Sequence, residues 1–215
     1  MLPRTSNDYF GEVTDASLSA LLELSLTLGA YRDALVLVGG WVPFFLIDEF
    51  GRGVFAHVGS IDIDLAVNPE MIKDDGYLTI VELIQERGYS MRHGRDGRPV
   101  PFSYEKEIGE RSYGHSHVIS IDFLTCATSD PGSHRHRMVQ SPLSARIANG
   151  CDLAFDHNFD KEIRGILLGN GESSTRIKML DLAGCIGMKG VALGERYKEK
   201  DAYDIFSVIS QCLDG

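Results

Sequence analysis

The chain has 215 residues, of which 43% are hydrophobic and 24% are charged, as is usual for a soluble globular protein. This length suits one domain with a single core. The formal net charge of -10 argues against a protein that coats nucleic acid with a broad basic surface, and no apolar run is long enough to cross a membrane. The four cysteines form no Cys-x-x-Cys pair and no secretory leader is visible, so we expect reduced thiols and a cytoplasmic protein.

Predicted helices and strands alternate in the first third of the chain. Leucines at helical spacing predict a helix over 14–29, and the short apolar run that follows predicts a buried strand over 35–38. After a glycine pair, large apolar residues predict a helix over 41–50, which a Gly-Arg-Gly segment ends. Alternating Ile and Asp residues then predict a strand over 61–67.

The middle of the chain contains mostly predicted strands. An amphipathic pattern predicts a helix over 75–87. Three strands are predicted after it, over 89–93, 102–108 and 117–126. Residues 129–140 are rich in Ser, Pro, Gly, His and Arg, a composition that predicts a loop.

Helices are predicted to dominate the last part. One or two strands are expected over 152–166, followed by a helix over 173–193 and a final helix over 203–212. The complete pattern predicts an α/β (α+β) protein in which a small mixed sheet is flanked by helices. We expect a core over 1–145 and a mainly helical C-terminal part over 146–215 that completes the functional site.

Three aspartates stand on otherwise apolar strands. Asp62 and Asp64 are two residues apart, so their side chains share one face of a strand, and adjacent carboxylates repel unless a cation neutralises them. Asp122 is the single carboxylate within its apolar strand. Three such carboxylates on one sheet would suit Mg²⁺. The alternatives are a solvated strand face for the first two and a structural aspartate at a strand end for the third.

Two glycine-containing turns precede these strands and helices. Gly59 and Ser60 come directly before the Asp-Ile-Asp segment, and Gly39 and Gly40 come directly before the helix that begins at Trp41. Glycine lets backbone N–H groups approach an anion closely because no side chain blocks the approach. A helix that begins at such a turn adds its own free N–H groups. We therefore predict that both turns face a triphosphate.

With these motifs the sequence resembles the nucleotidyltransferase superfamily, which includes DNA polymerase beta and the antibiotic nucleotidyltransferases. The resemblance implies a nucleotidyltransferase fold, in which paired aspartates bind the metal ions and a later aspartate completes the site. It also implies that the serine of the Gly-Ser turn contacts the triphosphate. The matching residues are Gly39-Gly40, Gly59-Ser60-Ile61-Asp62-Ile63-Asp64 and Asp122 within Ile121-Asp122-Phe123.

The C-terminal part is similar to the closing motif of the AbiEii-type nucleotidyltransferases, which are the toxin halves of some toxin–antitoxin pairs. The matching residues are Lys189, Arg196, Lys200-Asp201 and Asp204-Ile205. The resemblance implies that Lys189 meets the phosphates and that Arg196 and Asp201 belong to the site. For Asp201 and Asp204 the alternative is a role in capping the last helix, where acidic residues are favoured.

Arginines cluster in two predicted loops. Arg135, Arg137 and Arg146 form one group, and Arg92, Arg95 and Arg98 form the other. They are either ordinary solvated side chains or an electropositive rim for NTP or RNA.

The expected activity is Mg²⁺-dependent transfer of a nucleoside monophosphate from an NTP, ATP among them, to an acceptor with release of pyrophosphate. Resemblance to the toxin type implies RNA, in particular tRNA, as the acceptor and an antitoxin protein as a partner. One alternative is a small-molecule acceptor, because Gly39-Gly40-Trp41 and the segment 62–67 also resemble lincosamide nucleotidyltransferases. The other is a module that binds a nucleotide or a partner without catalysis.

Overall fold

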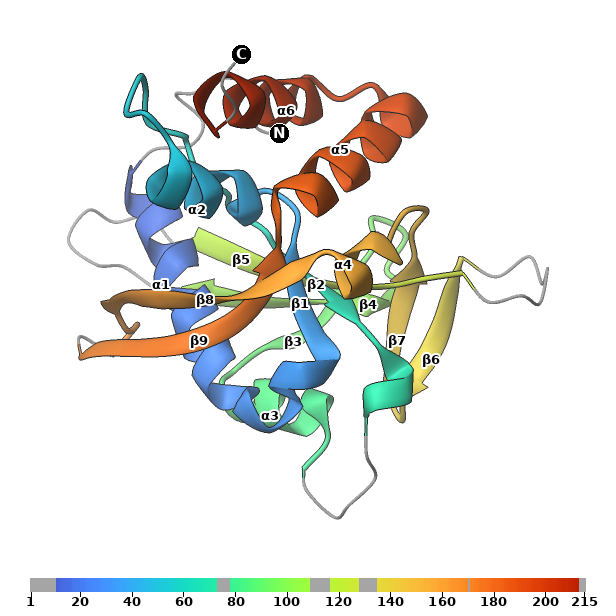
Figure 1. The fold of residues 1–215 in the computed structure, drawn as a ribbon. Coiled ribbons are helices and arrows are strands. Elements are labelled where there is room, and N and C mark those ends of the chain that lie inside the picture. Colours follow the sequence, from blue (N-terminus) through green and yellow to red (C-terminus); the bar gives the residue numbers. More distant parts are fainter. Residues whose placement is uncertain (1–10, 73–77, 109–116, 128–134, 170, 213–215) are drawn as a thin grey trace.

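The chain folds into a mixed sheet with helices on both of its faces (Figure 1). The computed structural model describes residues 11–72, 78–108, 117–127, 135–169 and 171–212. The helices are α1 (Gly11–Thr27), α2 (Trp41–Phe50), α3 (Ile80–Glu86), α4 (Leu153–Asp156), α5 (Leu182–Arg196) and α6 (Glu199–Cys212), with short 3-10 helices at Gly29–Ala34 and Pro69–Met71. The strands are β1 (Leu35–Val38), β2 (Ile63–Val67), β3 (Ser90–His93), β4 (Pro99–Ile108), β5 (His117–Thr125), β6 (His136–Gln140), β7 (Leu143–Ile147), β8 (Asn158–Ile166) and β9 (Glu172–Leu180).

Strand β2 lies in the middle of the sheet and carries Asp64, with Asp62 directly before it. The described strands follow the order β3-β4-β5-β2-β1-β9-β8, and β7 pairs with β5 and β6 beside this path. Strand β2 runs parallel to β5 and antiparallel to β1, and β1 runs parallel to β9. The sheet is therefore mixed, and β2 has a neighbour along each edge.

The two faces of the sheet have different partners. Leu65 of β2 and Ile177 of β9 line a small pocket together with leucines of α1 on one face. Asp64, one residue earlier, points to the opposite face, which α5 covers. In Figure 1, α2, α5 and α6 lie on this second side and α3 lies on the other. The alternation within β2 therefore sends its leucine into the core and its aspartate toward the C-terminal helices.

Most elements predicted for the first 126 residues are confirmed, with small shifts at their ends. The helix over 41–50 and the strand over 35–38 have the predicted bounds. Helix α3 begins at Ile80, where Thr79 and Glu82 form a reciprocal capping box that stops the helix from starting earlier. The beginning of the predicted helix, residues 75–77, lies outside the described residues.

Two predictions for the second half are wrong. Residues 136–140 of the predicted loop form β6, which pairs with the unpredicted strand β7, while residues 129–134 lie outside the described part. Residues 173–180 of the predicted helix belong to β9, and α5 begins only at Leu182, where the Asp181 side chain accepts from the Gly184 N–H at 2.8 Å. Hairpin β8–β9 thus enlarges the sheet beyond the small one predicted.

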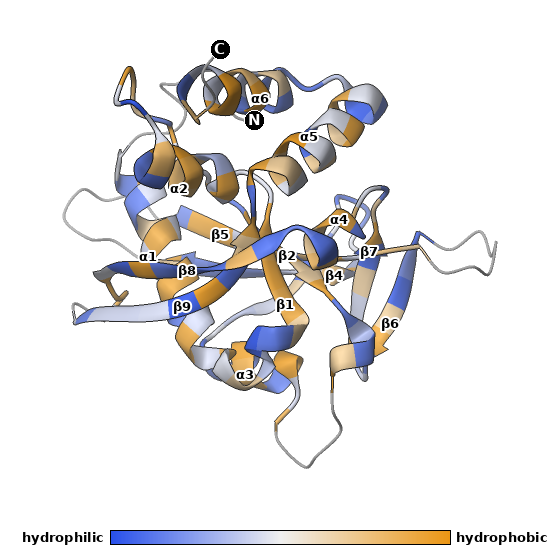
Figure 2. Ribbon diagram, in the orientation of Figure 1, coloured by the Kyte–Doolittle hydropathy of each residue, from blue (hydrophilic) through white to orange (hydrophobic). Residues whose placement is uncertain are grey.

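The core follows the central strands. All four residues of β1 are buried, and the Trp41 side chain at the start of α2 has no exposed surface. Figure 2 shows hydrophobic residues along β1 and an alternation of hydrophobic and hydrophilic residues along β8. The four cysteines are free thiols. No helix in the described residues has both the length and the hydropathy needed to cross a bilayer.

Candidate functional site

The three predicted aspartates lie on one face of the sheet. Asp64 of β2 and Asp122 of β5 are direct neighbours in the parallel pairing of the two strands. Asp62 precedes Asp64 by two residues, and its Oδ1 accepts a hydrogen bond of 2.5 Å from the Ser120 hydroxyl of β5. Because alternate residues share a face, the register gathers carboxylates that are about sixty residues apart in the sequence.

The glycine pair lies directly against this face. Gly39 has φ 77°, and a Cβ at this position would lie 2.0 Å from the Asp64 Oδ2. A Cβ on Gly40 would lie 2.6 Å from the Ser60 hydroxyl oxygen. The turn between β1 and α2 therefore touches both the Asp64 carboxylate and the Gly59-Ser60 turn, and only glycine permits both approaches. The two glycine-containing segments form one surface beside Asp64.

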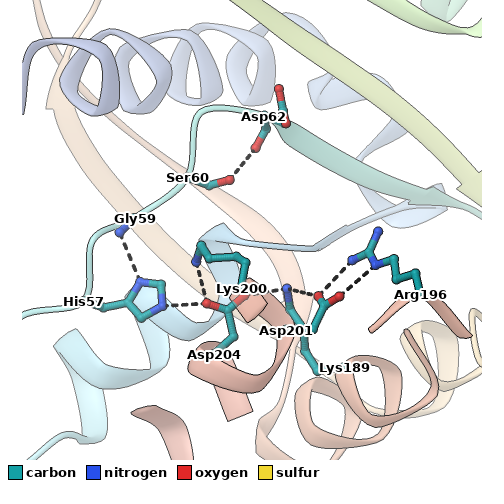
Figure 3. Close-up of polar contacts among 9 residues, drawn as sticks. All are labelled: His57, Gly59, Ser60, Asp62, Lys189, Arg196, Lys200, Asp201 and Asp204. Carbon is teal, nitrogen blue, oxygen red and sulfur yellow. Dashed lines mark hydrogen bonds and ion pairs between the residues drawn. The ribbon is translucent and has the colours of Figure 1, made fainter. Parts of the chain in front are cut away.

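The Ser60 hydroxyl is already used within its own turn. It donates to the backbone carbonyl of Asp62 at 3.0 Å, and Ser60 is only 8% exposed. Figure 3 shows the Ser60 side chain directed toward Asp62. Its immediate role is thus to hold the turn that leads into β2.

A cluster of paired charges connects α5 with α6 (Figure 3). The Lys189 Nζ of α5 lies 2.6 Å from the Asp204 Oδ2 and 3.4 Å from the Asp201 Oδ1. The Arg196 guanidinium donates to both oxygens of Asp201, at 2.7 and 2.8 Å. Lys200 also pairs with Asp204. The five charged residues of the predicted closing motif therefore meet, and their charges pair with one another.

Burial and pairing set the ionisation of this cluster. Burial disfavours charge on Asp204, but hydrogen bonds and attraction from His57, Lys189 and Lys200 prevail and lower its pKa to about 2. Burial likewise opposes the charge of Lys189, yet Asp204, Asp201 and Asp64 raise the pKa of Lys189 above its ordinary value. Both shifts favour the charged forms of Asp204 and Lys189, whereas burial lowers the pKa of Lys200.

His57 was not predicted from the sequence, yet it connects the cluster with the Gly59 turn. Its Nδ1 accepts from the Gly59 N–H at 3.1 Å, so its Nε2 carries the hydrogen and donates to the Asp204 Oδ1 at 3.0 Å. Burial lowers the pKa of His57, which keeps this ring neutral. Its position two residues before Gly59 is the only sequence signal that points to it.

The pKa of Asp64 is shifted in the opposite direction to that of Asp204. Burial, followed by the negative charges of Asp122 and Asp62, raises its pKa to about 7, and only the more weakly acting Lys189 and Arg146 lower it. The aspartate face therefore carries uncompensated negative charge, which a bound cation would relieve.

The carboxylates of this face are the candidate ligands for the predicted Mg²⁺. In the described part of the chain, no group of three or more His, Cys, Asp or Glu side chains is arranged to hold a metal ion. The Asp62 Oδ1 accepts a hydrogen bond from the Ser120 hydroxyl. All the oxygens are carboxylate oxygens, however, and the buried Asp122 Oδ1 has no hydrogen-bond partner. This chemistry fits Mg²⁺, with Asp64 and Asp122 as its centre.

A pocket separates the aspartate face from α5. Its walls include Gly39 and Asp64 from the sheet side and Lys189, Glu195 and Arg196 from α5. Arg146 of β7 lines it as well. The Cys185 thiol is also on its lining, but burial raises its pKa to about 12, so this thiol stays protonated. The pocket offers carboxylate and cationic groups within one small volume.

Comparison with known proteins assigns no family. No protein-family model matches the chain, and no solved structure matches it significantly. The sequence is 26% identical over 130 residues to a queuine tRNA-ribosyltransferase from Mesorhizobium japonicum. This similarity covers 58% of the chain and 34% of that protein, so the chain matches about a third of the relative's length.

Proposed function

We propose that this protein is a Mg²⁺-dependent nucleotidyltransferase with the nucleotidyltransferase fold, and that it transfers a nucleoside monophosphate from an NTP to a hydroxyl acceptor. The observation that carries the proposal is that Asp64, the strand neighbour of Asp122, lines a pocket together with Gly39. Uncompensated carboxylates beside a glycine-lined turn match the needs of a metal-bound triphosphate.

In this reaction the acceptor oxygen attacks the α-phosphorus and forms a new P–O bond. The bond to the bridging oxygen breaks, and pyrophosphate leaves with the bonding electron pair. Asp122, whose Oδ1 is buried without a partner, takes the proton of the acceptor hydroxyl. Asp62, Asp64 and Asp122 would hold Mg²⁺, which when bound supplies charge neutralisation for the triphosphate.

The remaining groups position the substrate. The backbone at Gly39 and Gly40 can approach a phosphate because neither residue carries a side chain. His57 and Ser60 hold the second turn in place. Lys189 contributes a positive charge near Asp64, although its direct contacts are with Asp201 and Asp204. Arg196 and Asp201 support it through their bidentate pair.

For the acceptor we propose RNA, with tRNA as the first candidate, and a cytoplasmic toxin of a toxin–antitoxin pair as the biological role. The C-terminal charge cluster supports the toxin type because all its motif residues assemble in one place. The similarity to a protein named as a tRNA-ribosyltransferase is compatible with tRNA. An antibiotic-type enzyme and a non-catalytic nucleotide-binding or partner-binding module are the competing functions.

The test is incubation of the protein with each labelled NTP, Mg²⁺ and total cell RNA. We expect labelled RNA from the wild type and a loss of at least about 100-fold for Asp64→Asn and Asp122→Asn. Asp33→Asn is the matched control, because its side chain is 68% exposed and Asp33 precedes β1, whereas Gly39 follows the other end of that strand. Undiminished labelling by Asp64→Asn would contradict the proposed catalyst.

Two further results separate the competing functions. Growth arrest on expression supports the toxin type, whereas raised drug tolerance supports the antibiotic type. Absence of Mg²⁺-dependent turnover with every NTP and acceptor supports the non-catalytic module.

A further inference from the structure

We infer that Arg146 binds the polyphosphate of the nucleotide, a role expected from the sequence for Lys189. The inference rests on the proposed function, because it names the group that receives the anionic end of the NTP. It also assigns a role to one arginine that sequence patterns do not distinguish from its neighbours.

Strand pairing places Arg146 on the aspartate face. Arg146 of β7 is the direct neighbour of Leu124 of β5. Leu124 follows Asp122 by two residues, so Leu124, Asp122 and Arg146 share a face of the sheet. Arg146, Leu124 and Asp64 all line the pocket beneath α5.

The charges of the pocket distinguish Arg146 from the other two cations. Lys189 is bound to Asp201 and Asp204, and Arg196 forms a bidentate pair with Asp201. Within the described residues, the Arg146 guanidinium has no such carboxylate pair, and its buried Nε has no hydrogen-bond partner. Among these three cations, Arg146 is thus the one that is not already paired with a carboxylate.

A buried N–H without a partner costs free energy, and a phosphate would satisfy it. The planar guanidinium matches two phosphate oxygens at once, which an ammonium cannot do. Arg146 and Asp64 line the same pocket, so a phosphate held by Arg146 would lie in the volume that the Asp64 carboxylate also faces.

The walls of the pocket favour a nucleotide over an RNA backbone. Leu124, Leu180, Met188 and Ala192 give it apolar sides, as is usual for a small-molecule site. A polyphosphate at Arg146 would place the apolar part of the same ligand against these residues. A folded RNA would approach from outside, where exposed arginines such as Arg135 lie.

The experiment measures binding of inorganic tripolyphosphate, ATP and AMP to the full chain by calorimetry in the presence of Mg²⁺. For Arg146→Gln we expect tripolyphosphate and ATP to bind about ten to a hundred times more weakly, with AMP changed much less. Arg146→Lys should recover only part of the loss. Arg135→Gln removes the same charge from an exposed neighbouring position and should bind all three ligands like the wild type.

Three outcomes would overturn the inference. They are wild-type affinity for tripolyphosphate in Arg146→Gln, absence of tripolyphosphate binding by the wild-type protein, and an equal weakening of ATP and AMP binding in Arg146→Gln. The thermal midpoint of each variant shows whether it folds, and Arg146→Lys carries the test should Arg146→Gln not fold. A protein that transfers no nucleotide but loses tripolyphosphate binding in Arg146→Gln would uphold this inference and contradict the proposed function.

Discussion

Two groups of charged residues lie within the same part of the molecule and are organised in opposite ways. On α5 and α6, Lys189, Asp201 and Asp204 are buried and paired with opposite charges. On β2 and β5, Asp64 and Asp122 are neighbours of the same sign. The first group completes its interactions inside the protein, whereas the second requires something from outside. The paired residues on α5 and α6 therefore support the site, whereas a ligand is expected to bind at the aspartates on β2 and β5.

The largest expected effect is the loss of a buried partner from the paired group. Asp204→Ala would leave Lys189 and Lys200 without their shared carboxylate in a buried environment. We expect a loss of about 3–5 kcal/mol in the free energy of unfolding, measured by urea denaturation. Asp33→Ala, at an exposed position, should change it by about 0.5 kcal/mol or less. Equal stability of the two variants would mean that the cluster does not contribute as its pairing indicates.

Removing the negative charge of Asp64, which belongs to the unpaired group on β2 and β5, should raise the free energy of unfolding instead of lowering it. Asp64 has a pKa of about 7 in the folded protein against 3.8 unfolded, so the folded state binds its proton more tightly. Stability from this group is complete below about pH 4 and is lost as the pH rises through 7, on the order of 2–4 kcal/mol in total.

Asp64→Asn cannot titrate, so it should match the wild type at pH 4 and exceed it in stability at pH 8. Urea denaturation of both proteins without Mg²⁺ measures the difference. Added Mg²⁺ should raise the wild-type unfolding free energy at pH 8 and leave Asp64→Asn nearly unchanged, because a ligand stabilises only the state that binds it. Parallel pH profiles for the two proteins would contradict the assigned pKa.

Gly39 lies so close to the Asp64 carboxylate that a side chain at this position should destabilise the protein. Gly39→Ala adds a Cβ at a position with φ 77° and within 2.0 Å of the Asp64 carboxylate. We expect a cost of about 2–3 kcal/mol in thermal or urea unfolding. Gly53→Ala is the control, since its φ is 70° but no atom lies near the added Cβ. Equal losses of stability in Gly39→Ala and Gly53→Ala would mean that backbone strain alone causes them and that the contact with Asp64 adds nothing.

The smallest change in the free energy of unfolding is expected at His57, which connects the charge cluster with the Gly59 turn. His57→Ala removes a hydrogen bond to Asp204 and one from the Gly59 amide, at a cost of about 1–2 kcal/mol. Amide hydrogen exchange should accelerate at Gly59. His57→Gln keeps a donor for Asp204 and should recover part of the stability. Unchanged exchange at Gly59 would show that the turn does not depend on His57.

Elements with strong local patterns were predictable, and those that depend on distant partners were not. The strand over 35–38 is apolar throughout and the helix over 41–50 follows a glycine pair, so local physics decides both. Residues 173–180 alternate weakly between polar and apolar side chains and become a strand because β1 and β8 lie on either side. Strands β6 and β7 likewise exist through pairing with each other and with β5.

At the site, the residue types alone indicate which positions carry charge and which turns lack side chains. They support Asp62, Asp64 and Asp122 as candidates because carboxylates on apolar strands are costly without a partner. Which charges are compensated depends on the side chains that meet across the fold, so it becomes visible only in three dimensions. The fold paired Lys189 with Asp204, brought His57 to Gly59, and left Arg146 facing the pocket beside Asp64.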